Sequence, residues 1–173
     1  MPKVFILDVD GVLTTGQMFY TAEGKAMKVF GPDDNDALCL LKPHLEIRFV
    51  SSDSRGFPIS RKRVVEDMKF PLDLVPTAGR LQWIAERYDP ADVIFMGDGI
   101  FDHYVLEAVG YGIAPANASI HARNAADYVT RHAGGDRAVA EACLHVLEKF
   151  FEPYVPSVPL SEDRTAFGRT QAG

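Results

Sequence analysis

The sequence predicts a doubly wound α/β fold, in which a parallel sheet is covered by helices on both faces. Short continuous hydrophobic runs recur along the chain, and helical patterns lie between them. The length of 173 residues suits one compact domain. Hydrophobic residues make up 47% of the chain, which is enough for a core and argues against disorder of the whole chain.

The expected strands are hydrophobic runs bounded by turn residues. They lie at 3–7, 46–50, 73–75, 92–96 and 110–114. Between them, hydrophobic residues recur at the spacing of one helix face, which predicts helices at 34–43, 58–69, 79–88 and about 135–150. Because strands buried on both faces are hydrophobic throughout, we expect the strands to be parallel.

Two segments depart from this alternation. Residues 16–30 predict a flap hairpin, since two strand-prone arms flank Gly24, and glycine permits positive φ at a tight turn. The chain after Pro153 contains further prolines and then becomes polar. We therefore expect one domain over 3–152 and a C-terminal tail over 153–173 that is extended or disordered.

Charge and composition exclude several classes of function. The formal net charge of -6 disfavours nucleic acid and anionic membranes as partners, because both need clustered cations. No hydrophobic run approaches the roughly 18 residues that a membrane span needs. The two cysteines, Cys39 and Cys143, lie far apart without metal-ligand spacing, and the N-terminus enters a strand without a signal-peptide pattern. We expect a cytoplasmic protein with reduced thiols.

Two carboxylates interrupt the end of the most hydrophobic run, and a glycine follows them. Asp8 and Asp10 are two residues apart, so both can face one ligand beyond the strand end, and Gly11 allows the backbone to approach that ligand closely. Adjacent acids repel each other unless a cation or a shared proton intervenes. A hard divalent metal such as Mg²⁺ is the simplest partner, because it binds carboxylate, carbonyl and phosphate oxygens.

Other polar residues follow the remaining strand ends. Ser51 follows the second strand, Asp98 and Asp102 follow the fourth, and Arg80 begins a helix. In a doubly wound sheet, ligands bind outside the carboxyl ends of the strands, so these side chains can meet around a metal and a phosphoryl group. Taken singly, each has a plain alternative as a turn residue, a helix cap or a surface residue.

Together these residues resemble the haloacid dehalogenase superfamily of phosphatases. The likeness rests on "DVDGVLTTG" (8–16), the serine after the second strand, the basic residue that opens a helix, and "GDGIFD" (97–102). The flap, "NAADYVT" (124–130) and "HAGGDRAVAEAC" (132–143) resemble its small branch without a cap domain, typified by 3-deoxy-D-manno-octulosonate 8-phosphate phosphatase.

The resemblance implies a role for each site residue. Asp8 would be the nucleophile that forms an aspartyl-phosphate, and Asp10 would be the general acid and base. Mg²⁺ would bind Asp8, the backbone carbonyl of Asp10, and Asp98. Ser51 and Arg80 would contact the phosphoryl group. Asp102 would orient Arg80 or metal-bound water.

The resemblance also implies where the substrate lies and how this chain departs from its branch. Substrate contacts are expected from Gly11, Asp34, Ser52 and Asp53. Ser52-Asp53 stands where the branch has Gly-Arg, and Asp33-Asp34-Asn35 (33–35) stands where it has Arg-Asp-Gly. Each change replaces a guanidinium by a carboxylate, so we expect the octulosonate phosphate not to be the best substrate.

The function predicted from these patterns is a Mg²⁺-dependent phosphatase of a small sugar phosphate. Relatives in the branch assemble as tetramers, so the resemblance implies a homotetramer in which neighbours help to cover the site. The alternative is a catalytically weak or inactive module that serves assembly in sugar or sugar-nucleotide biosynthesis. The acids near the expected substrate favour that alternative slightly, whereas the complete set of Asp8, Asp10, Asp98 and Arg80 favours an enzyme.

Overall fold

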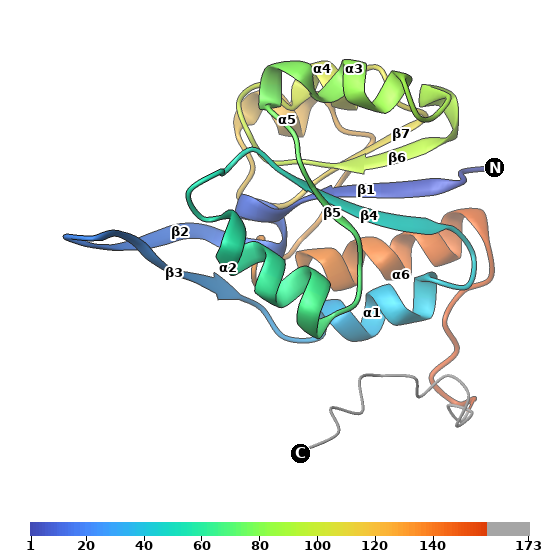
Figure 1. Cartoon of the computed structure of the whole chain (residues 1–173). Coiled ribbons are helices and arrows are strands. Elements are labelled where there is room, and N and C mark those ends of the chain that lie inside the picture. Colours follow the sequence, from blue (N-terminus) through green and yellow to red (C-terminus); the bar gives the residue numbers. More distant parts are fainter. Residues whose placement is uncertain (159–173) are drawn as a thin grey trace.

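The computed structural model describes residues 1–158. At its centre is a six-stranded sheet in the order β5-β4-β1-β6-β7-β8, in which all neighbouring strands are parallel (Figure 1). The strands are β1 (Val4–Asp8), β4 (Glu46–Ser51), β5 (Leu72–Leu74), β6 (Val93–Met96), β7 (Tyr111–Ala114) and β8 (Tyr128–Val129). The strand order reverses direction at β1, which makes the fold doubly wound as predicted.

Helices cover both faces of this sheet. On one face lie α1 (Asp34–Leu41), α2 (Phe57–Arg61) and α6 (Ala138–Phe150), and on the other lie α3 (Arg80–Ala85), α4 (His103–Leu106) and α5 (Ile120–Ala125) (Figure 1). The helix α2 continues through a wider helical turn at Lys62–Asp67. Within the described residues, the only addition to this three-layer body is a hairpin, and no cap domain is present.

The side chains of β1 alternate between two hydrophobic cores, because successive residues of a strand point to opposite faces. Phe5 and Leu7 pack with α1 and α6, whereas Val4 and Ile6 pack with α3, α4 and α5. All four are fully buried, and burial of such side chains stabilises a fold by roughly 1.5–3 kcal/mol each. The same alternation places Asp8, the last residue of the strand, on the face of α3 and α4.

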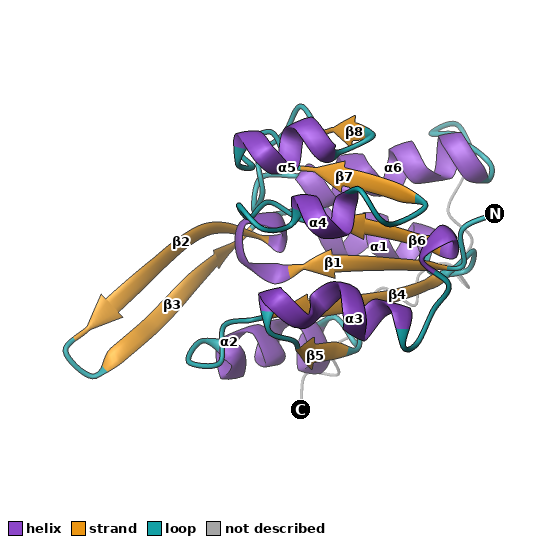
Figure 2. Ribbon diagram, turned by 90° about the horizontal axis from the view of Figure 1, so that it is seen from above, coloured by secondary structure: helices purple, strands orange, loops and turns teal. Residues whose placement is uncertain are grey.

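The predicted flap is an antiparallel hairpin of β2 (Thr14–Thr21) and β3 (Gly24–Phe30). Gly24 has a φ of 127° at the turn, a conformation that glycine adopts without strain. The hairpin projects from the body at the edge of the sheet where β1 ends (Figure 2). Exposed hydrophobic side chains on it are Phe19, Tyr20, Met27 and Val29.

The five predicted strands and four predicted helical segments are confirmed within one or a few residues at each end. The sequence prediction missed the two-residue β8 and the short helices α4 and α5. None of the helices in the described part of the chain is long and hydrophobic enough to cross a lipid bilayer. The tail predicted for 153–173 falls mostly on 159–173, which lie outside the described residues.

Glu141 in α6 connects that helix to the chain that follows β8. Its carboxylate accepts hydrogen bonds from the backbone amides of Arg131 and His132 and from the Tyr128 hydroxyl, at 2.8–3.0 Å, and Nδ1 of His132 lies 2.7 Å from it. Burial by itself would raise the pKa of Glu141, but these hydrogen bonds outweigh it and lower the pKa to about 2, from an ordinary value of 4.5.

We expect Glu141→Gln to lower the free energy of unfolding by about 2 kcal/mol at pH 7. Because the pKa is depressed in the folded protein, this stabilisation is complete above pH 4.5 and is lost as the pH falls toward 2. Urea unfolding of both proteins from pH 7 to pH 3 measures the difference. A difference that stays constant or grows on acidification would contradict this assignment.

Candidate active site

The candidate site lies where parallel strands end at one edge of the sheet. β1 ends at Asp8, its neighbour β4 ends at Ser51, and Asp98 follows two residues after the end of β6, the neighbour on the other side. Parallel strands run in the same direction, so these three chain ends meet at one edge. This topology explains why residues that are distant in the sequence come together, as predicted.

Arg80, the first residue of α3, is buried between two of the acids. Its Nη2 donates to Oδ1 of Asp8 at 3.2 Å, and its Nη1 donates to Oδ1 of Asp102 at 2.7 Å. The guanidinium also lies 5.8 Å from the centre of the Phe95 ring. Only 1% of the Arg80 surface is exposed, and a buried cation is tolerated when it is paired in this way.

Three carboxylates gather around this guanidinium. Asp8, Asp98 and Asp102 each place one oxygen within 4.8 Å of the others. Burial and the neighbouring acids outweigh the attraction of Arg80 and raise the pKa of Asp8 to about 8. Burial and then Asp102 raise the pKa of Asp98 to about 7. One guanidinium does not balance three close carboxylates, and an oxygen-only donor set of this kind fits a hard divalent cation.

The chain leaves β1 through a tight turn at Val9–Leu13 in which Asp10 and Gly11 are not helical. Gly11 has a φ of 93°, and its amide donates to Oγ1 of Thr14 at 3.2 Å. A Cβ at Gly11 would lie 2.0 Å from Oδ2 of Asp98, far inside van der Waals contact. Only glycine therefore lets the turn pack directly against the Asp98 carboxylate.

We expect Gly11→Ala to reduce kcat/KM at least about 100-fold, because Asp98 must move to make room for the methyl group. The strained φ adds roughly 1–2 kcal/mol of lost stability. Steady-state kinetics and thermal unfolding measure the two effects, with Gly79→Ala as the control, since a Cβ there meets nothing within 4 Å. Full activity of Gly11→Ala would contradict the close packing of this turn against Asp98.

A glycine pair, Gly134-Gly135, that was not predicted as part of the site packs against this turn. A Cβ at Gly134 would lie 1.8 Å from the carbonyl oxygen of Gly11. The Gly135 amide donates to the carbonyl of Val12 at 3.2 Å, and the Gly134 amide donates to Oδ1 of Asn117 at 2.8 Å. The only sequence signal for this contact is the Gly-Gly pair itself in "HAGGDR" (132–137).

The Asp10 carboxylate is not one of the three clustered carboxylates and contacts the flap. Ser51, which is fully buried, donates to Oδ2 of Asp10 at 3.3 Å. The ammonium of Lys28 lies 2.8 Å from Oδ1 and 2.9 Å from Oδ2 of the same carboxylate. Lys28 was not predicted as a site residue, because a lysine in a hairpin arm gives no sign in the sequence that its side chain is buried.

Asp33 and Asp53, the two acids that were expected to repel a carboxylated substrate, are both paired with cations of this chain. Asp53 accepts from Lys25 at 2.5 Å and lies 2.9 Å from the Lys28 ammonium. Burial would raise the pKa of Asp53, but the lysines outweigh it and lower the pKa to about 2. Asp33 is exposed and pairs with Arg137 at 2.6 Å. The expected repulsion of a carboxylated substrate is therefore largely offset.

The remaining two residues expected near the substrate lie in different surroundings. Ser52 is exposed, next to the site residue Ser51. Asp34 is 2% exposed, and its Oδ1 accepts from the Ala140 amide in the first turn of α6 at 3.0 Å. Burial raises the pKa of Asp34 to about 6. Substrate contacts of both residues remain predictions.

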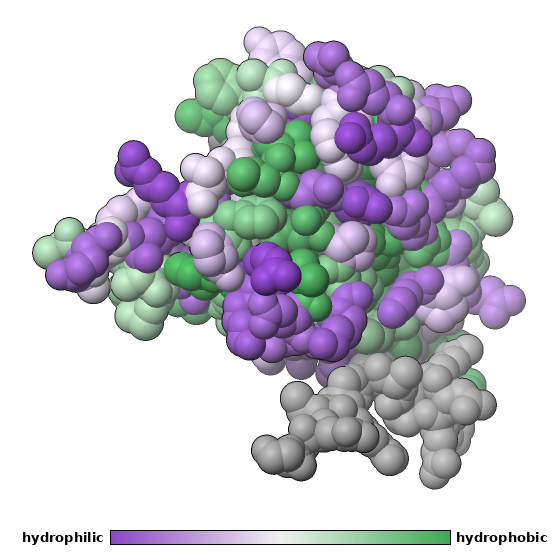
Figure 3. Space-filling view, in the orientation of Figure 1, coloured by the Kyte–Doolittle hydropathy of each residue, from purple (hydrophilic) through white to green (hydrophobic). Residues whose placement is uncertain are grey.

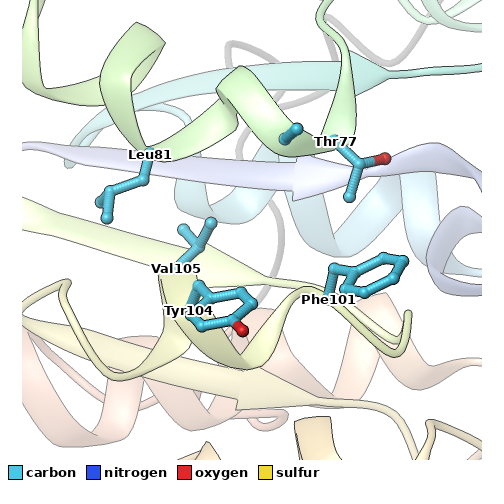
Figure 4. Close-up of a pocket in the computed structure, with 6 residues that line it drawn as sticks. Thr77, Leu81, Phe101, Tyr104 and Val105 are labelled. Carbon is cyan, nitrogen blue, oxygen red and sulfur yellow. The ribbon is translucent and has the colours of Figure 1, made fainter.

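A cavity of about 410 Å³ adjoins the site between α3 and α4. The side chains of Thr77 and Leu81 face those of Phe101, Tyr104 and Val105 across it (Figure 4). The lining residues flank Arg80 and Asp102 in the sequence, so the same two segments contribute to the cavity and to the charged cluster. The lining is mainly hydrophobic.

Fold and site together define a class of hydrolase. A carboxylate at the end of the central strand, a second carboxylate two residues later, a buried cation and an acid after the neighbouring strand are the groups needed for phosphoryl transfer through a covalent aspartate. The family model described as haloacid dehalogenase-like hydrolase matches residues 81–142.

Individual relatives narrow this class. The chain is 31% identical over 153 residues to 3-deoxy-D-manno-octulosonate 8-phosphate phosphatase of Escherichia coli K12, covering 82% of this chain and 77% of that protein. It is also 31% identical to the Haemophilus influenzae enzyme of that name over 154 residues, covering 84% of this chain and 83% of that protein.

Solved structures agree with the sequence matches. The cobalt-bound phosphatase of Haemophilus influenzae aligns with a TM-score of 0.74 at 28% identity, covering 85% of each chain. The Moraxella catarrhalis phosphatase, solved with magnesium, phosphate and KDO, aligns with a TM-score of 0.72 at 25% identity, covering 85% of this chain and 86% of that one. The chain belongs to the 3-deoxy-D-manno-octulosonate 8-phosphate phosphatase branch of the haloacid dehalogenase superfamily. The relatives of that name are phosphoric monoester hydrolases, and so is this protein.

Proposed function

We propose that this protein is a Mg²⁺-dependent phosphatase that hydrolyses a small sugar phosphate through an aspartyl-phosphate on Asp8. The observation that carries the proposal is the position of Asp8 at the end of β1, in contact with the buried Arg80 and within 4.8 Å of Asp98. The substrate class follows from the relatives in the branch, which are named as phosphatases of a sugar acid phosphate.

In the first half-reaction an oxygen of Asp8 attacks phosphorus and the bond from phosphorus to the sugar oxygen breaks. Arg80 holds Oδ1 of Asp8, which orients the carboxylate and leaves Oδ2 for the attack. The guanidinium also offsets negative charge on the transferring group. Mg²⁺, held by Asp8, Asp98 and the backbone carbonyl of Asp10, would supply the positive charge that offsets repulsion between carboxylate and phosphate.

Asp10 moves the protons in both half-reactions. It first protonates the departing sugar oxygen, and it then accepts a proton from the water that splits the aspartyl-phosphate and releases phosphate. Ser51 donates a hydrogen bond to Asp10 in this structure, and its hydroxyl can instead donate to a phosphoryl oxygen when substrate is bound. The flap and the turn at Val9–Leu13 surround Asp10 on the side of Lys28 and limit its contact with bulk water.

A panel of sugar phosphates with Mg²⁺ tests the proposal. We expect phosphate release that stops on addition of EDTA and returns with excess Mg²⁺. Neutral sugar phosphates should exceed the octulosonate phosphate in kcat/KM by about tenfold, because the pairing of Asp53 with lysines offsets repulsion without restoring a free guanidinium. No release from any sugar phosphate would contradict the proposed function, and octulosonate phosphate as the best substrate would contradict the preference alone.

We also propose that the chain forms a homotetramer. The exposed hydrophobic residues of the projecting hairpin are the observation that supports an interface, and Figure 3 shows hydrophobic and hydrophilic residues side by side on this hairpin. Light scattering coupled to gel filtration should give about four times the 19.1 kDa mass of one chain. A monomeric mass would contradict this assembly.

Both cysteines are free, in keeping with the expected cytoplasmic location.

A further inference from the structure

Lys28 is a buried cation that has no assigned role in the proposed phosphoryl transfer. Its side chain is 0% exposed, although it lies on the flap strand β3, whose neighbouring side chains Met27 and Val29 are exposed. An ammonium is costly to bury unless each of its hydrogens has an acceptor. In this protein Lys28 has three partners, namely Asp10, Asp53 and Ser60, whose Oγ lies 2.9 Å away.

These partners come from three different segments of the chain. Asp10 lies in the turn after β1, Asp53 follows β4, and Ser60 lies in α2. The ammonium therefore holds the flap against the body of the protein at the position of the proposed acid and base. Lys25, three residues before Lys28 on β3, also pairs with Asp53 but has no contact with Asp10 among the described hydrogen bonds and ion pairs.

Asp53 completes the charge balance of this group. Two acids, Asp10 and Asp53, face two ammonium groups, Lys25 and Lys28, so the cluster has no net charge while Asp10 is ionised and one positive charge while Asp10 holds the proton for the leaving oxygen. Asp53 is further fixed by the Gly56 amide, which donates to Oδ1 at 3.1 Å. Because Asp53 is anchored to its own loop, it fixes the ammonium of Lys28, which in turn contacts both oxygens of Asp10.

Among the described residues, the only side chain besides Lys28 that makes a hydrogen bond or ion pair with the Asp10 carboxylate is Ser51, at 3.3 Å. Ser51 is also the hydroxyl expected to turn toward a phosphoryl oxygen, and this would release Asp10. Lys28 is then the group that keeps the carboxylate from rotating while substrate is bound. General acid catalysis depends on such placement, because the proton must be within hydrogen-bond reach of the leaving oxygen.

We propose that Lys28 is a positioning residue that holds Asp10 in place for proton transfer, and that Asp53 holds Lys28. This inference rests on the proposed function. It separates the flap lysines into two roles: Lys28 acts on the chemistry through Asp10, whereas Lys25 only reinforces the ion pair that closes the flap.

The test compares two phosphate esters that differ in their need for a general acid. p-Nitrophenyl phosphate has a leaving group that departs without a proton, whereas an alkyl phosphate such as a hexose 6-phosphate needs one. We expect Lys28→Met to lower kcat/KM for the alkyl ester about 30- to 100-fold and for the aryl ester less than about threefold. Lys25→Met, the matched control, should leave the ratio of the two values within about twofold of wild type.

Two further variants separate positioning from folding or phosphate binding. The double variant Lys28→Met/Asp53→Asn removes a cation and an anion together, so it leaves the net charge of the chain unchanged and should show the same change in ratio. In an Asp10→Asn background, Lys28→Met should cause no further change in the ratio, since the lysine acts through Asp10. Circular dichroism and thermal unfolding establish that each variant is folded.

The outcomes that overturn the inference are distinct from failure of the proposed function. An equal fall in kcat/KM for both esters would mean that Lys28 serves phosphate binding or folding. An unchanged or improved use of the alkyl ester, or a further change in the Asp10→Asn background, would also contradict it. If the wild-type protein with Mg²⁺ released phosphate from neither ester, the proposed function would fail, and this inference with it.

Discussion

Replacing Asp8 by asparagine is expected to lower kcat/KM for phosphate esters roughly 10⁴-fold or more, the largest effect of any single substitution in this chain. An amide of nearly the same shape cannot attack phosphorus, so the covalent route is lost while the fold remains. Phosphate release with saturating Mg²⁺, measured for both proteins on the same sugar phosphate, gives this ratio.

The stability of Asp8→Asn gives an independent check. Burial and the acids Asp98 and Asp102 raise the pKa of Asp8, so its ionisation opposes folding when no cation is bound. In EDTA at pH 9, above the raised pKa, the variant should therefore unfold at the same or a higher temperature than wild type. Asp67→Asn, at an exposed position, is the control for both measurements. Retained activity of Asp8→Asn would contradict the proposed role of Asp8 as the nucleophile.

Replacing Arg80 by methionine is the second large expected effect, and it acts on stability as well as on rate. The substitution leaves Asp8 and Asp102 buried without their cation, and removal of one partner of a buried pair costs about 3–5 kcal/mol. Loss of a preorganised donor to the transferring group lowers kcat by roughly 10²–10³. Urea unfolding at pH 7 and steady-state kinetics measure the two losses.

Arg87→Met is the matched control for this variant. Arg87 is half-exposed, its guanidinium lies 4.5 Å from the Trp83 ring, and its contact with Glu86 is a long one of 3.5 Å. Exposed contacts of this kind contribute about 0–1 kcal/mol. Excess Mg²⁺ should recover part of the stability that Arg80→Met loses, because the cation occupies the same acidic cluster. An Arg80→Met protein as stable and active as Arg87→Met would contradict the assigned role of Arg80.

The sequence was sufficient to predict the parallel sheet, because strands buried on both faces must be hydrophobic throughout. β1 and β6 are fully buried runs of this kind. β8 could not be found in this way, since its two residues, Tyr128 and Val129, are only partly buried or exposed at the edge of the sheet. The helices α4 and α5 are too short to show a helical repeat of hydrophobic residues.

Within the site, the predicted residues are those whose positions follow from chain topology. Asp8, Ser51 and Asp98 come together because parallel strands end at one edge, and Arg80 lies at the start of the helix that packs over them. Lys28 could not be predicted, because its inward position depends on how the flap folds back onto Asp10.

The glycine contact that supports the turn after β1 could not be predicted either, because it also depends on tertiary structure. Gly134 packs against the carbonyl of Gly11 across more than a hundred residues of sequence, and only the folded structure reveals the missing space for a side chain. The pairing of Asp53 with two flap lysines is also a tertiary contact. The sequence alone presented Asp53 as a negative charge facing the substrate, whereas the structure shows it as part of a neutral cluster.

Chemical trapping of the covalent intermediate tests the central claim most directly. Wild-type protein mixed with Mg²⁺ and p-nitrophenyl phosphate, quenched in acid within milliseconds and digested, should yield the N-terminal peptide carrying one phosphoryl group on Asp8. Recovery of unmodified peptide throughout the burst of nitrophenol release, or of the phosphoryl group on any other residue, would contradict the transfer of phosphate to this aspartate.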